Sequence, residues 1–431
     1  MPRIVHFGLG NFHRAHQAWY TDHAGGWTIT GVIMSNRAER DHLAAHGNAY
    51  LLGIWGKDGL RSEKISVYDD ILLATDQPQE IIDRIADPET HVVTLTVTEK
   101  GYYLRSGDAR IDLSAEPIQH DLTSETPKTA IGLLAAGLIK RAGQPLTVIS
   151  CDNLSDNGRK LGQAMADYLA EKDPDTADWL ANKVSFPNAM VDRITPRLGD
   201  DATAEVAEVA GEIGPPTVGT EDFSEWVIED NFAASRPDWD KAGAELVPDV
   251  APFEERKLRL LNASHSYLAY AGQLAGHQFV HEAIADPTLR AGVDALWDEA
   301  GSTVSRPASD SIDAYRAALL DRFAVPAMRH SLSQIAMDGS MKLRERLVPI
   351  LLARVAAGQE APQTTRAIAS WMAFVWNAVE AGEALNDPNK GQLAAAASDP
   401  NAFHAKLAIL IGLPEEHLAA VAEEASALLA K

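Results

Sequence analysis

IVHFGLG, residues 4–10, is a short apolar run that ends in a glycine turn, and a helical pattern follows it over about 13–24. The alternation then repeats, with a β-rich run at 28–35, a helical pattern at 37–45, and a helix opened by Pro78 at 78–87. A long β-branched strand at 91–103, a helix at 129–143 and an apolar strand at 146–153 continue it. Alternating helices and near-continuous apolar strands predict an α/β domain with a parallel sheet.

The pattern changes after about Asp249. Residues 250–276 form one long helical pattern opened by Pro252, and the rest of the chain is rich in Ala and Leu with helical periodicity. Prolines interrupt that periodicity at Pro287, Pro307, Pro326, Pro362, Pro388, Pro400 and Pro414. We therefore predict an α/β domain over 1–250 and a mostly α-helical domain over 251–431.

Composition excludes several classes of function. The chain has 431 residues and a net charge of −23, which argues against a nucleic-acid partner because phosphate binding requires a basic surface. Cys151 is the single cysteine, so a disulfide framework and a thiolate-rich zinc site are excluded. No apolar run is long enough to span a membrane, and a strand-like run begins at once. We expect no membrane association, no signal peptide and a cytoplasmic protein.

The turn after the first strand carries a possible cofactor signal. Gly8 and Gly10 supply G-x-G, where a dinucleotide fold makes a tight turn and brings its backbone close to pyrophosphate. His13 stands in place of the third glycine, so the generic match is weak and a glycine turn without a ligand is the alternative. Arg14 could add a phosphate contact or could be a surface arginine.

The end of the second strand bears on the choice of cofactor. An Asp or Glu usually stands there to bind the ribose of NAD, but residues 34–37 read Met-Ser-Asn-Arg. Arg37 could accept a 2′-phosphate, stack on adenine, or be a solvated arginine at a helix start. These residues leave NAD and NADP open.

KLRLLNASH, residues 257–265, carries the candidate catalytic groups. On an α-helix, Asn262 lies about 140° from Lys257 around the helix axis, and His265 lies about 60° back from Asn262. These three residues and Glu254 therefore lie on one side of the helix. Burial lowers a lysine pKa, so Lys257 could act as a base, Asn262 could donate to a developing oxyanion, and His265 could hold a substrate hydroxyl. The alternative is an amphipathic helix with a solvated polar face.

Seven stretches together resemble the polyol-specific long-chain dehydrogenase/reductases, the mannitol dehydrogenase family. They occur in family order and cover most of the chain: GLGNFHRAHQ (8–17), TVTEKGYY (96–103), SCDNLSDNG (150–158), FPNAMVDRITP (186–196), EDFSEWVIEDNF (221–232), KLRLLNASHSYLAY (257–270) and QIAMDGSMKL (334–343). The resemblance implies a Rossmann-type N-terminal domain followed by a mostly α-helical C-terminal domain, and hydride transfer without zinc or another metal.

The resemblance also implies a role for each matching residue. Lys257 would be the general base assisted by Glu254; Asn153 and Asn262 would stabilise the oxyanion; His265 and Asp192 would position hydroxyls; and Lys342 would contact the far end of the substrate. Apart from the resemblance, Arg329 is a second candidate cation for a substrate carboxylate. The candidate cofactor-binding residues are Gly8, Gly10, Phe12, Arg14 and Arg37. Asn153 and Asp192 also have structural alternatives. Asn153 could only cap a helix, and Asp192 could form an ion pair with Arg193.

The predicted activity is an NAD-dependent interconversion of a keto-sugar acid or ketose and its reduced form, with NADP not excluded. Fructuronate and mannonate are the favoured pair, and mannitol with fructose is the alternative. A non-catalytic nucleotide-binding protein is the alternative of another class, while the single cysteine disfavours a metal-dependent alcohol dehydrogenase. We expect a sugar acid or polyol as the small-molecule partner, and a monomer or small homo-oligomer.

Overall fold

The computed structural model describes residues 1–105, 108–305 and 311–430, so Pro307 lies outside the described residues. The chain divides into two compact units, Met1–Ala251 and Pro252–Lys431. The first unit is α/β and the second is helical, which confirms the predicted fold class. The assignment of 1–250 as the dinucleotide-binding domain and of 251–431 as the substrate and catalytic domain stays a prediction.

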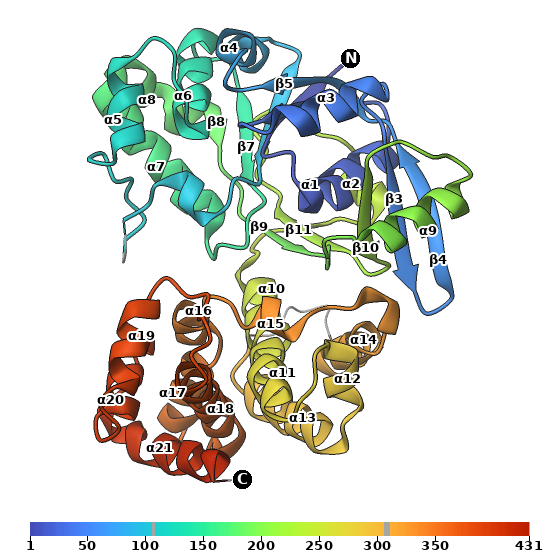
Figure 1. Ribbon diagram of the computed structural model, residues 1–431. Helices are drawn as coiled ribbons and strands as arrows, with labels where there is room; N and C mark the ends of the chain where they lie inside the picture. Colours follow the sequence, from blue (N-terminus) through green and yellow to red (C-terminus); the bar gives the residue numbers. More distant parts are fainter. Residues whose placement is uncertain (106–107, 306–310, 431) are drawn as a thin grey trace. The chain divides into compact units, whose positions relative to one another are not determined.

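A six-stranded sheet is the centre of the first unit (Figure 1). All of its pairings are parallel. Its strands, in spatial order, are β5 (Tyr68–Leu73), β2 (Thr28–Ile33), β1 (Arg3–Phe7), β6 (Thr90–Leu95), β7 (Leu146–Ser150) and β8 (Val184–Ser185). Counted along the chain, these six strands have the order 3-2-1-4-5-6 of a dinucleotide-binding fold, whose ligand lies where the order reverses at the carboxyl ends of the strands. That reversal lies between β1 and β6.

Alternate residues of the strands enter two separate cores, because successive side chains of a strand point to opposite faces. Val5 and Phe7 of β1 pack with α4, α6 and α7, while Ile4 packs with α1, α2 and the smaller sheets. The helices of this unit are α1 (Asn11–Ala15), α2 (Gln17–Ala24), α3 (Arg37–Ala45), α4 (Pro78–Ala86), α5 (Glu116–Thr123), α6 (Ala130–Arg141), α7 (Asn157–Lys172), α8 (Pro174–Lys183) and α9 (Asp200–Ala210). The sheet is therefore covered on both faces.

Two three-stranded sheets complete the first unit, and neither was predicted. One holds β10 (Thr217–Glu221), β3 (Tyr50–Gly56) and β4 (Gly59–Ile65), and the other holds β12 (Glu245–Val247), β11 (Glu225–Glu229) and β9 (Ala189–Asp192). β3 and β4 form an antiparallel hairpin. β9 matters for function because it ends at Asp192.

Two predicted elements differ from the structure. The helix expected over 13–24 is broken at His16 (φ −123°, ψ −90°), whose ring bonds the carbonyl of Glu225 at 3.0 Å. The strand expected over 91–103 ends at Leu95, and a short 3₁₀ helix, η1 (Glu99–Tyr102), replaces its second half. In both places a long-range contact overrides the local pattern.

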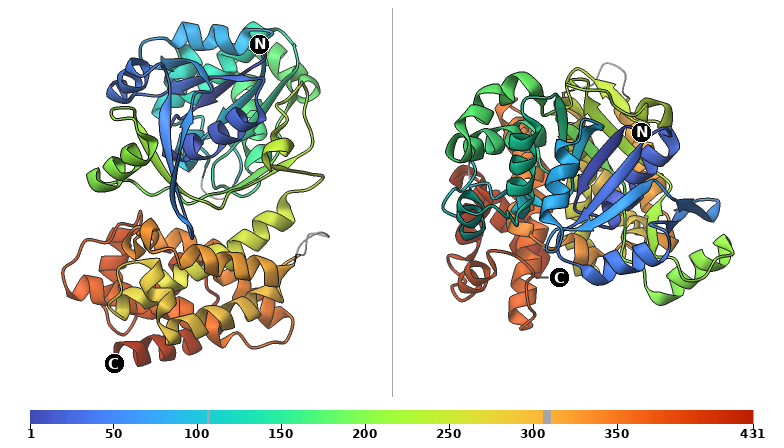
Figure 2. Two further views of the ribbon diagram at one scale, coloured as in Figure 1. Left: turned by 90° about the vertical axis from the view of Figure 1, so that its right-hand side faces the viewer. Right: turned by 90° about the horizontal axis from the view of Figure 1, so that it is seen from above.

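The second unit is built of helices (Figure 2). Within it α11 contacts α12, α13, α15, α16 and α18. Most of α11 is buried, as expected for a helix that is surrounded on several sides. Its elements are α10 (Ala251–Arg256), the π-helix η3 (Lys257–Asn262), α11 (Ala263–Leu274), α12 (Val280–Ala285), α13 (Pro287–Gly301), α14 (Ile312–Phe323), α15 (Leu332–Ile335), α16 (Gly339–Arg346), α17 (Val348–Ala356), α18 (Pro362–Glu380), α19 (Lys390–Ala397), α20 (Phe403–Ile411) and α21 (Glu415–Leu429).

Candidate active site

The glycine turn lies at the reversal point of the six-stranded sheet. Gly8 has φ +94°, and its amide donates to the carbonyl of Val32 at 3.0 Å. A Cβ on Gly8 would stand 2.1 Å from the carbonyl oxygen of Thr96, so both the dihedral and the space require glycine. A Cβ on Gly10 would meet nothing nearer than 3.9 Å. Exposed backbone with open space in front of it fits the close approach of a dinucleotide pyrophosphate.

Two stacked histidines lie next to this turn. The rings of His6 and His13 lie 3.3 Å apart between centroids and 10° from parallel. Nδ1 of His6 is 2.8 Å from the Thr94 hydroxyl, and Nε2 is 3.0 Å from the Thr96 hydroxyl. Burial lowers the pKa of His6 to about 3, so its ring is neutral at pH 7. His13, at the third-glycine position, thus packs under the turn, which the glycine pattern did not predict.

Arg14 is not a surface residue, so that alternative is wrong. Its side chain is almost fully buried, pairs with the Glu39 carboxylate at 2.6 Å, and donates to the Asn11 side chain at 2.8 Å. These contacts join α1 to the first turn of α3. Phe12, on the same helix, stacks on His16 with ring centroids 5.1 Å apart. Contacts of Arg14 and Phe12 with a cofactor stay predictions.

Arg37 is the first residue of α3, and its side chain is 55% exposed. Its guanidinium pairs with the carboxylate of Asp76, with nitrogen–oxygen distances of 2.5 and 2.6 Å. A carboxylate from the loop after β5 therefore lies beside Arg37.

Asp152 organises the loop that carries Asn153. Its carboxylate accepts the backbone amides of Val97 and Thr98 at 2.9 and 3.0 Å and the Tyr102 hydroxyl at 2.7 Å. Burial raises the pKa of this carboxyl although these bonds oppose the shift. The bonds tie the ends of β6 and β7 together, and they hold Thr98 at φ +68°, which is costly for a β-branched residue. Sequence analysis missed Asp152, and Asn153 is exposed beside it.

Asp192 is the last residue of β9 and is buried. The neighbouring Arg193 donates to the carbonyls of Ala15 and Glu221 at 2.6 and 3.2 Å, and its guanidinium lies 5.0 Å from the centroid of the Trp19 ring. Arg193 therefore fixes the end of β9 against α1 and α2. This holds Asp192 in place at the edge of the first unit's third sheet.

A buried polar face lies on the second unit at the junction of η3 and α11. Lys257, Asn262 and His265 are 8%, 7% and 7% exposed, so the prediction of a solvated face is wrong and the prediction of a buried set is confirmed. Glu254, on α10, is partly buried. Hydrogen bonds of a π-helix join residues five apart, so Lys257 and Asn262 lie about one turn apart on the same side. This alignment is closer than the α-helical one assumed from sequence.

Two atoms of this face are buried polar groups without a hydrogen-bond partner among the described residues: Nδ2 of Asn262 and Nε2 of His265. A buried polar group usually finds a partner, since leaving one unpaired costs about 1–3 kcal/mol. Two such atoms on one helical segment therefore fit a substrate that supplies oxygen atoms.

His265 lies among cationic side chains. Its ring is 4.8 Å from the Phe323 ring and 5.2 Å from the His330 ring, between centroids. Burial, and then electrostatic interactions with His330, Arg322, Arg346 and Lys342, hold the pKa of His265 well below its ordinary value. The imidazole is therefore neutral at pH 7. Arg322 and Arg346 were not predicted from the sequence.

The two predicted substrate cations differ in their surroundings. Nζ of Lys342 donates to the carbonyl of Ile335 at 3.1 Å, and this lysine contributes to the electrostatic field at His265. Arg329 is exposed, in a left-handed conformation (φ +41°), with its guanidinium 5.1 Å from the centroid of the Phe279 ring. The geometry thus favours Lys342 over Arg329 as a group near His265.

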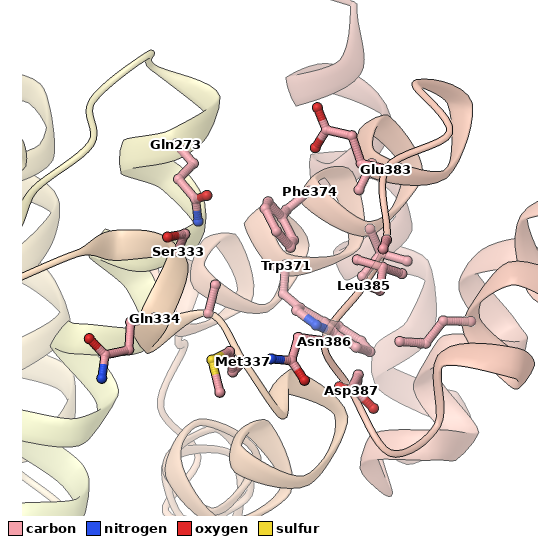
Figure 3. Close-up of a pocket in the computed structure, with 15 residues that line it drawn as sticks. Gln273, Ser333, Gln334, Met337, Trp371, Phe374, Glu383, Leu385, Asn386 and Asp387 are labelled. Atoms are coloured by element: carbon pink, nitrogen blue, oxygen red, sulfur yellow. The ribbon is translucent and has the colours of Figure 1, made fainter. Parts of the chain in front are cut away.

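A cavity of about 410 Å³ opens elsewhere in the second unit (Figure 3). Gln273, Ser333 and Gln334 lie on one side of it, and Trp371, Phe374 and Leu385 lie on another. Lys257, His265 and Lys342 are not among its lining residues. The QIAMDGSMKL stretch therefore borders this cavity with Gln334, Ala336 and Met337, while its Lys342 acts electrostatically on His265.

We expect the free energy of unfolding to fall when the pH is lowered from 7 to 5. His6 binds no proton in the folded state until about pH 3, whereas in the unfolded state it binds one below about 6.5. The unfolded state binds more protons between these values, so stability falls with falling pH, by about 2 kcal/mol at pH 5 for this residue. Urea unfolding at pH 7 and 5 measures the loss.

His6→Asn should reduce this pH-dependent loss by about the same 2 kcal/mol, since the titrating group is removed. His42→Gln, at an exposed position, is the matched control and should leave the loss as in the wild type. An unchanged pH dependence in His6→Asn would show that His6 is not buried in its neutral form.

A parallel sheet in the order 3-2-1-4-5-6, a glycine turn at its reversal point and a helical unit with a buried lysine, amide and imidazole define a two-domain dinucleotide-dependent oxidoreductase. Residues 2–241 match the family model of the mannitol dehydrogenase Rossmann domain, and residues 249–426 match that of the mannitol dehydrogenase C-terminal domain. The chain belongs to the mannitol dehydrogenase family, which confirms the resemblance and the expectation of an enzyme.

Three relatives are similar over most of the chain. D-mannonate oxidoreductase of Escherichia coli (strain K12) is 38% identical over 89% of this chain and 82% of its own length. A mannitol 2-dehydrogenase of Phaeosphaeria nodorum is 38% identical over 91% of this chain and 72% of its own length. The structure of Pseudomonas fluorescens mannitol 2-dehydrogenase in a ternary complex with NAD and D-mannitol has a TM-score of 0.89 and 34% identity, and covers 99% of this chain and 92% of that chain.

Two features are absent from the described residues. Within 1–105, 108–305 and 311–430, no group of three or more His, Cys, Asp or Glu side chains is placed to hold a metal ion. Over the same residues, no helix has the length and apolar character required to cross a bilayer.

Proposed function

We propose that the protein is an NAD-dependent oxidoreductase that interconverts a keto-sugar acid and its reduced sugar acid, with fructuronate and mannonate as the first pair. The observation that carries this proposal is the buried face of Lys257, Asn262 and His265, which lies among cations of the same unit. The family supports the reaction class, and the relative named D-mannonate oxidoreductase supports the substrate pair.

Each side chain of the face has a distinct role in this proposal. In the oxidation direction Lys257 accepts the proton of the substrate hydroxyl, and Glu254, one helical turn away, passes it on. Nδ2 of Asn262 donates to the oxygen as negative charge develops on it. The neutral His265 bonds a neighbouring hydroxyl and so orients the reacting carbon. NAD, when bound, would accept the hydride from that carbon.

The first unit would supply Asn153 as the second amide donor and Asp192 as a second group that orients hydroxyls. The bonds of Asp152 to Val97, Thr98 and Tyr102 hold the Asn153 loop. The contacts of Arg193 hold the end of β9, where Asp192 lies. The nucleotide would occupy the glycine turn, where Gly10 leaves its backbone accessible.

Charge favours an acidic substrate. Arg322, Lys342 and Arg346 all act electrostatically on His265, so an anion bound near this imidazole would gain Coulomb energy that a neutral polyol would not. Lys342 comes from α16, in the stretch 334–343. The carboxylate of a sugar acid is the anion that matches both the cations and the hydroxyl-binding groups.

Mannitol and fructose are the second candidate pair. The Pseudomonas fluorescens enzyme, whose structure contains NAD and D-mannitol, supports it through 34% identity across nearly the whole chain. A cytoplasmic location and a monomeric or small homo-oligomeric state remain predictions.

We expect mannonate with NAD⁺ to give the highest kcat/KM in a panel that also contains altronate, mannitol, arabinitol and sorbitol. Each substrate is tested with NAD⁺ and NADP⁺, and reduced cofactor is followed by absorbance. Lys342→Gln should lower kcat/KM for mannonate at least about ten-fold more than for mannitol, because one charge-assisted bond contributes about 1.5–3 kcal/mol.

Higher kcat/KM for mannitol than for mannonate would select the second pair. Binding of NADH, detected by fluorescence, without turnover of any of the five substrates would instead support the non-catalytic alternative.

A further inference from the structure

The end of β2 lacks the residue that usually recognises the ribose of NAD. Residues 34–37 contain no carboxylate. Asn36 cannot replace it freely, because its side-chain oxygen accepts the backbone amide of Glu39 at 3.2 Å and so caps α3. The carboxylate of Glu39 pairs with Arg14. Neither Asn36 nor Glu39 is therefore available to bind the 2′ position of the ribose, and any carboxylate that does so must come from outside residues 34–39.

Asp76 is placed at the same edge of the sheet. β5 pairs with β2 in parallel, and the amide of Ala74 donates to the carbonyl of Ile33 at 2.9 Å. The carboxyl ends of β2 and β5 thus lie side by side, beside α3 (Figure 1). Asp76 follows β5 by three residues, and its two oxygens lie 2.5 and 2.6 Å from Nη2 of Arg37. The Thr75 hydroxyl donates to the same carboxylate at 3.1 Å.

We propose that Asp76 determines cofactor preference: it pairs with Arg37 and opposes a 2′-phosphate, so that the protein favours NAD over NADP. The inference rests on the proposed NAD-dependent function. The carboxylate that usually follows β2 would then come from the loop after the neighbouring strand β5. Arg37 and Asp76 together would form an ion pair without net charge.

The physical argument concerns what a 2′-phosphate would meet. A guanidinium alone binds phosphate through two parallel hydrogen bonds and is a common determinant of NADP binding. With Asp76 bound, the pair has no net charge, and a phosphate would have to displace one anion and remain beside it. The hydrogen bond from Arg37 also lowers the pKa of Asp76, so its carboxyl is ionised throughout the working range of pH.

The pair is exposed, with Arg37 55% and Asp76 34% accessible. Exposed ion pairs contribute little to folding stability, so removing one partner should leave the fold intact. The main effect of removing the pair should then be a change in the affinity for NAD⁺ and NADP⁺, which substitution of Asp76 can test.

The test uses Asp76→Asn in the full chain, with Asp83→Asn as the matched control. Asp83 forms a similar exposed pair with Lys140 at 2.7 Å in the same unit. Calorimetry gives the Kd of NAD⁺ and of NADP⁺ for each variant, and steady-state kinetics gives the ratio of kcat/KM for the two cofactors. Asp76→Asn should raise the NADP⁺/NAD⁺ affinity ratio roughly ten-fold or more, the scale of one charge-assisted bond.

Two further results complete the test. Asp83→Asn should leave the affinity ratio as in the wild type, and Arg37→Ala combined with Asp76→Asn should abolish the gain in NADP⁺ affinity. An unchanged ratio in Asp76→Asn, with NAD⁺ still bound and reduced, would overturn this inference alone. A wild-type protein that binds neither cofactor would overturn the proposed function with it.

Discussion

Lys257→Ala is expected to lower kcat by about 10²–10⁴-fold, the contribution of a general base. Lys257 is 8% exposed and begins the π-helix that also carries Asn262. The Kd of NADH should change little, because the proposed nucleotide-binding groups are those of the glycine turn at Gly8 and Gly10 and do not include Lys257. Steady-state oxidation of the preferred substrate and NADH fluorescence titration measure the two quantities.

Arg259→Ala is the matched control for Lys257→Ala. Arg259 lies in the same π-helix, and its guanidinium pairs with Glu255 at 2.7 Å. Its replacement tests whether any loss of a cation from this helix lowers the rate. The base assignment fails if Lys257→Ala retains activity within a few-fold of the wild type, or if both variants lose activity equally.

Asn262→Ala should cost about 2.7–4 kcal/mol of transition-state stabilisation, the contribution of one oxyanion-hole donor. Nδ2 of Asn262 is buried without a hydrogen-bond partner among the described residues, so the structure offers the developing oxyanion a donor that is not engaged elsewhere. Asn153→Ala should have an effect of similar size. Single-turnover kinetics gives the rate of the hydride-transfer step for each variant.

The double replacement of Asn153 and Asn262 should lose less than the sum of the single losses, because donors to one oxygen act as a unit. Ser266→Ala is a control on the same helix, since the Ser266 hydroxyl donates to the carbonyl of Asn262 at 3.0 Å and accepts from the guanidinium of Arg346 at 3.4 Å. Normal turnover in both single variants would place the oxyanion donors elsewhere, and strictly additive losses would mean that the two amides do not share an acceptor.

The central sheet was predictable because its strands combine continuous apolar runs with helices of regular period. α3 spans Arg37–Ala45, the range that the pattern indicates, and β1, β2 and β7 begin within a residue or two of their predicted positions. The β3–β4 hairpin was overlooked although Asp58-Gly59 carries a turn signal between two alternating runs. That signal was present in the sequence and could have been used.

The early end of β6 could not be predicted from local preference. Val97 and Thr98 favour a strand, but the Asp152 carboxylate, 54 residues from Thr98, takes both of their amides. The same applies to the cations near His265. Arg322 lies on α14 and Arg346 on α16, and only tertiary packing brings them to one imidazole.

The sequence correctly predicts that Lys257, Asn262 and His265 are buried, but it does not predict the helical geometry that relates them. An α-helical period places Lys257 and Asn262 about 140° apart, whereas residues five apart in a π-helix are hydrogen-bonded neighbours. A π-helix has no reliable sequence signal, because it forms where packing on both sides fixes the flanking turns. Here Trp297 donates from its indole to the carbonyl of Leu260 at 3.1 Å, which is one such constraint.

The π-helix also makes the alignment of Lys257 with Asn262 depend on the number of residues between them. Each residue of an α-helix turns the chain by about 100°, so one residue more or less rotates every later side chain about the helix axis. A π-helix has wider turns and holds an additional residue without that rotation. Loss of a single residue between Lys257 and Asn262 would turn His265 and all of α11 relative to Lys257, or else turn Lys257 away from the face. Exchange of Leu258, Leu260 or Leu261 for an apolar side chain of similar volume should therefore be tolerated better than deletion of one residue, because a deletion changes the alignment of Lys257 with Asn262 and His265.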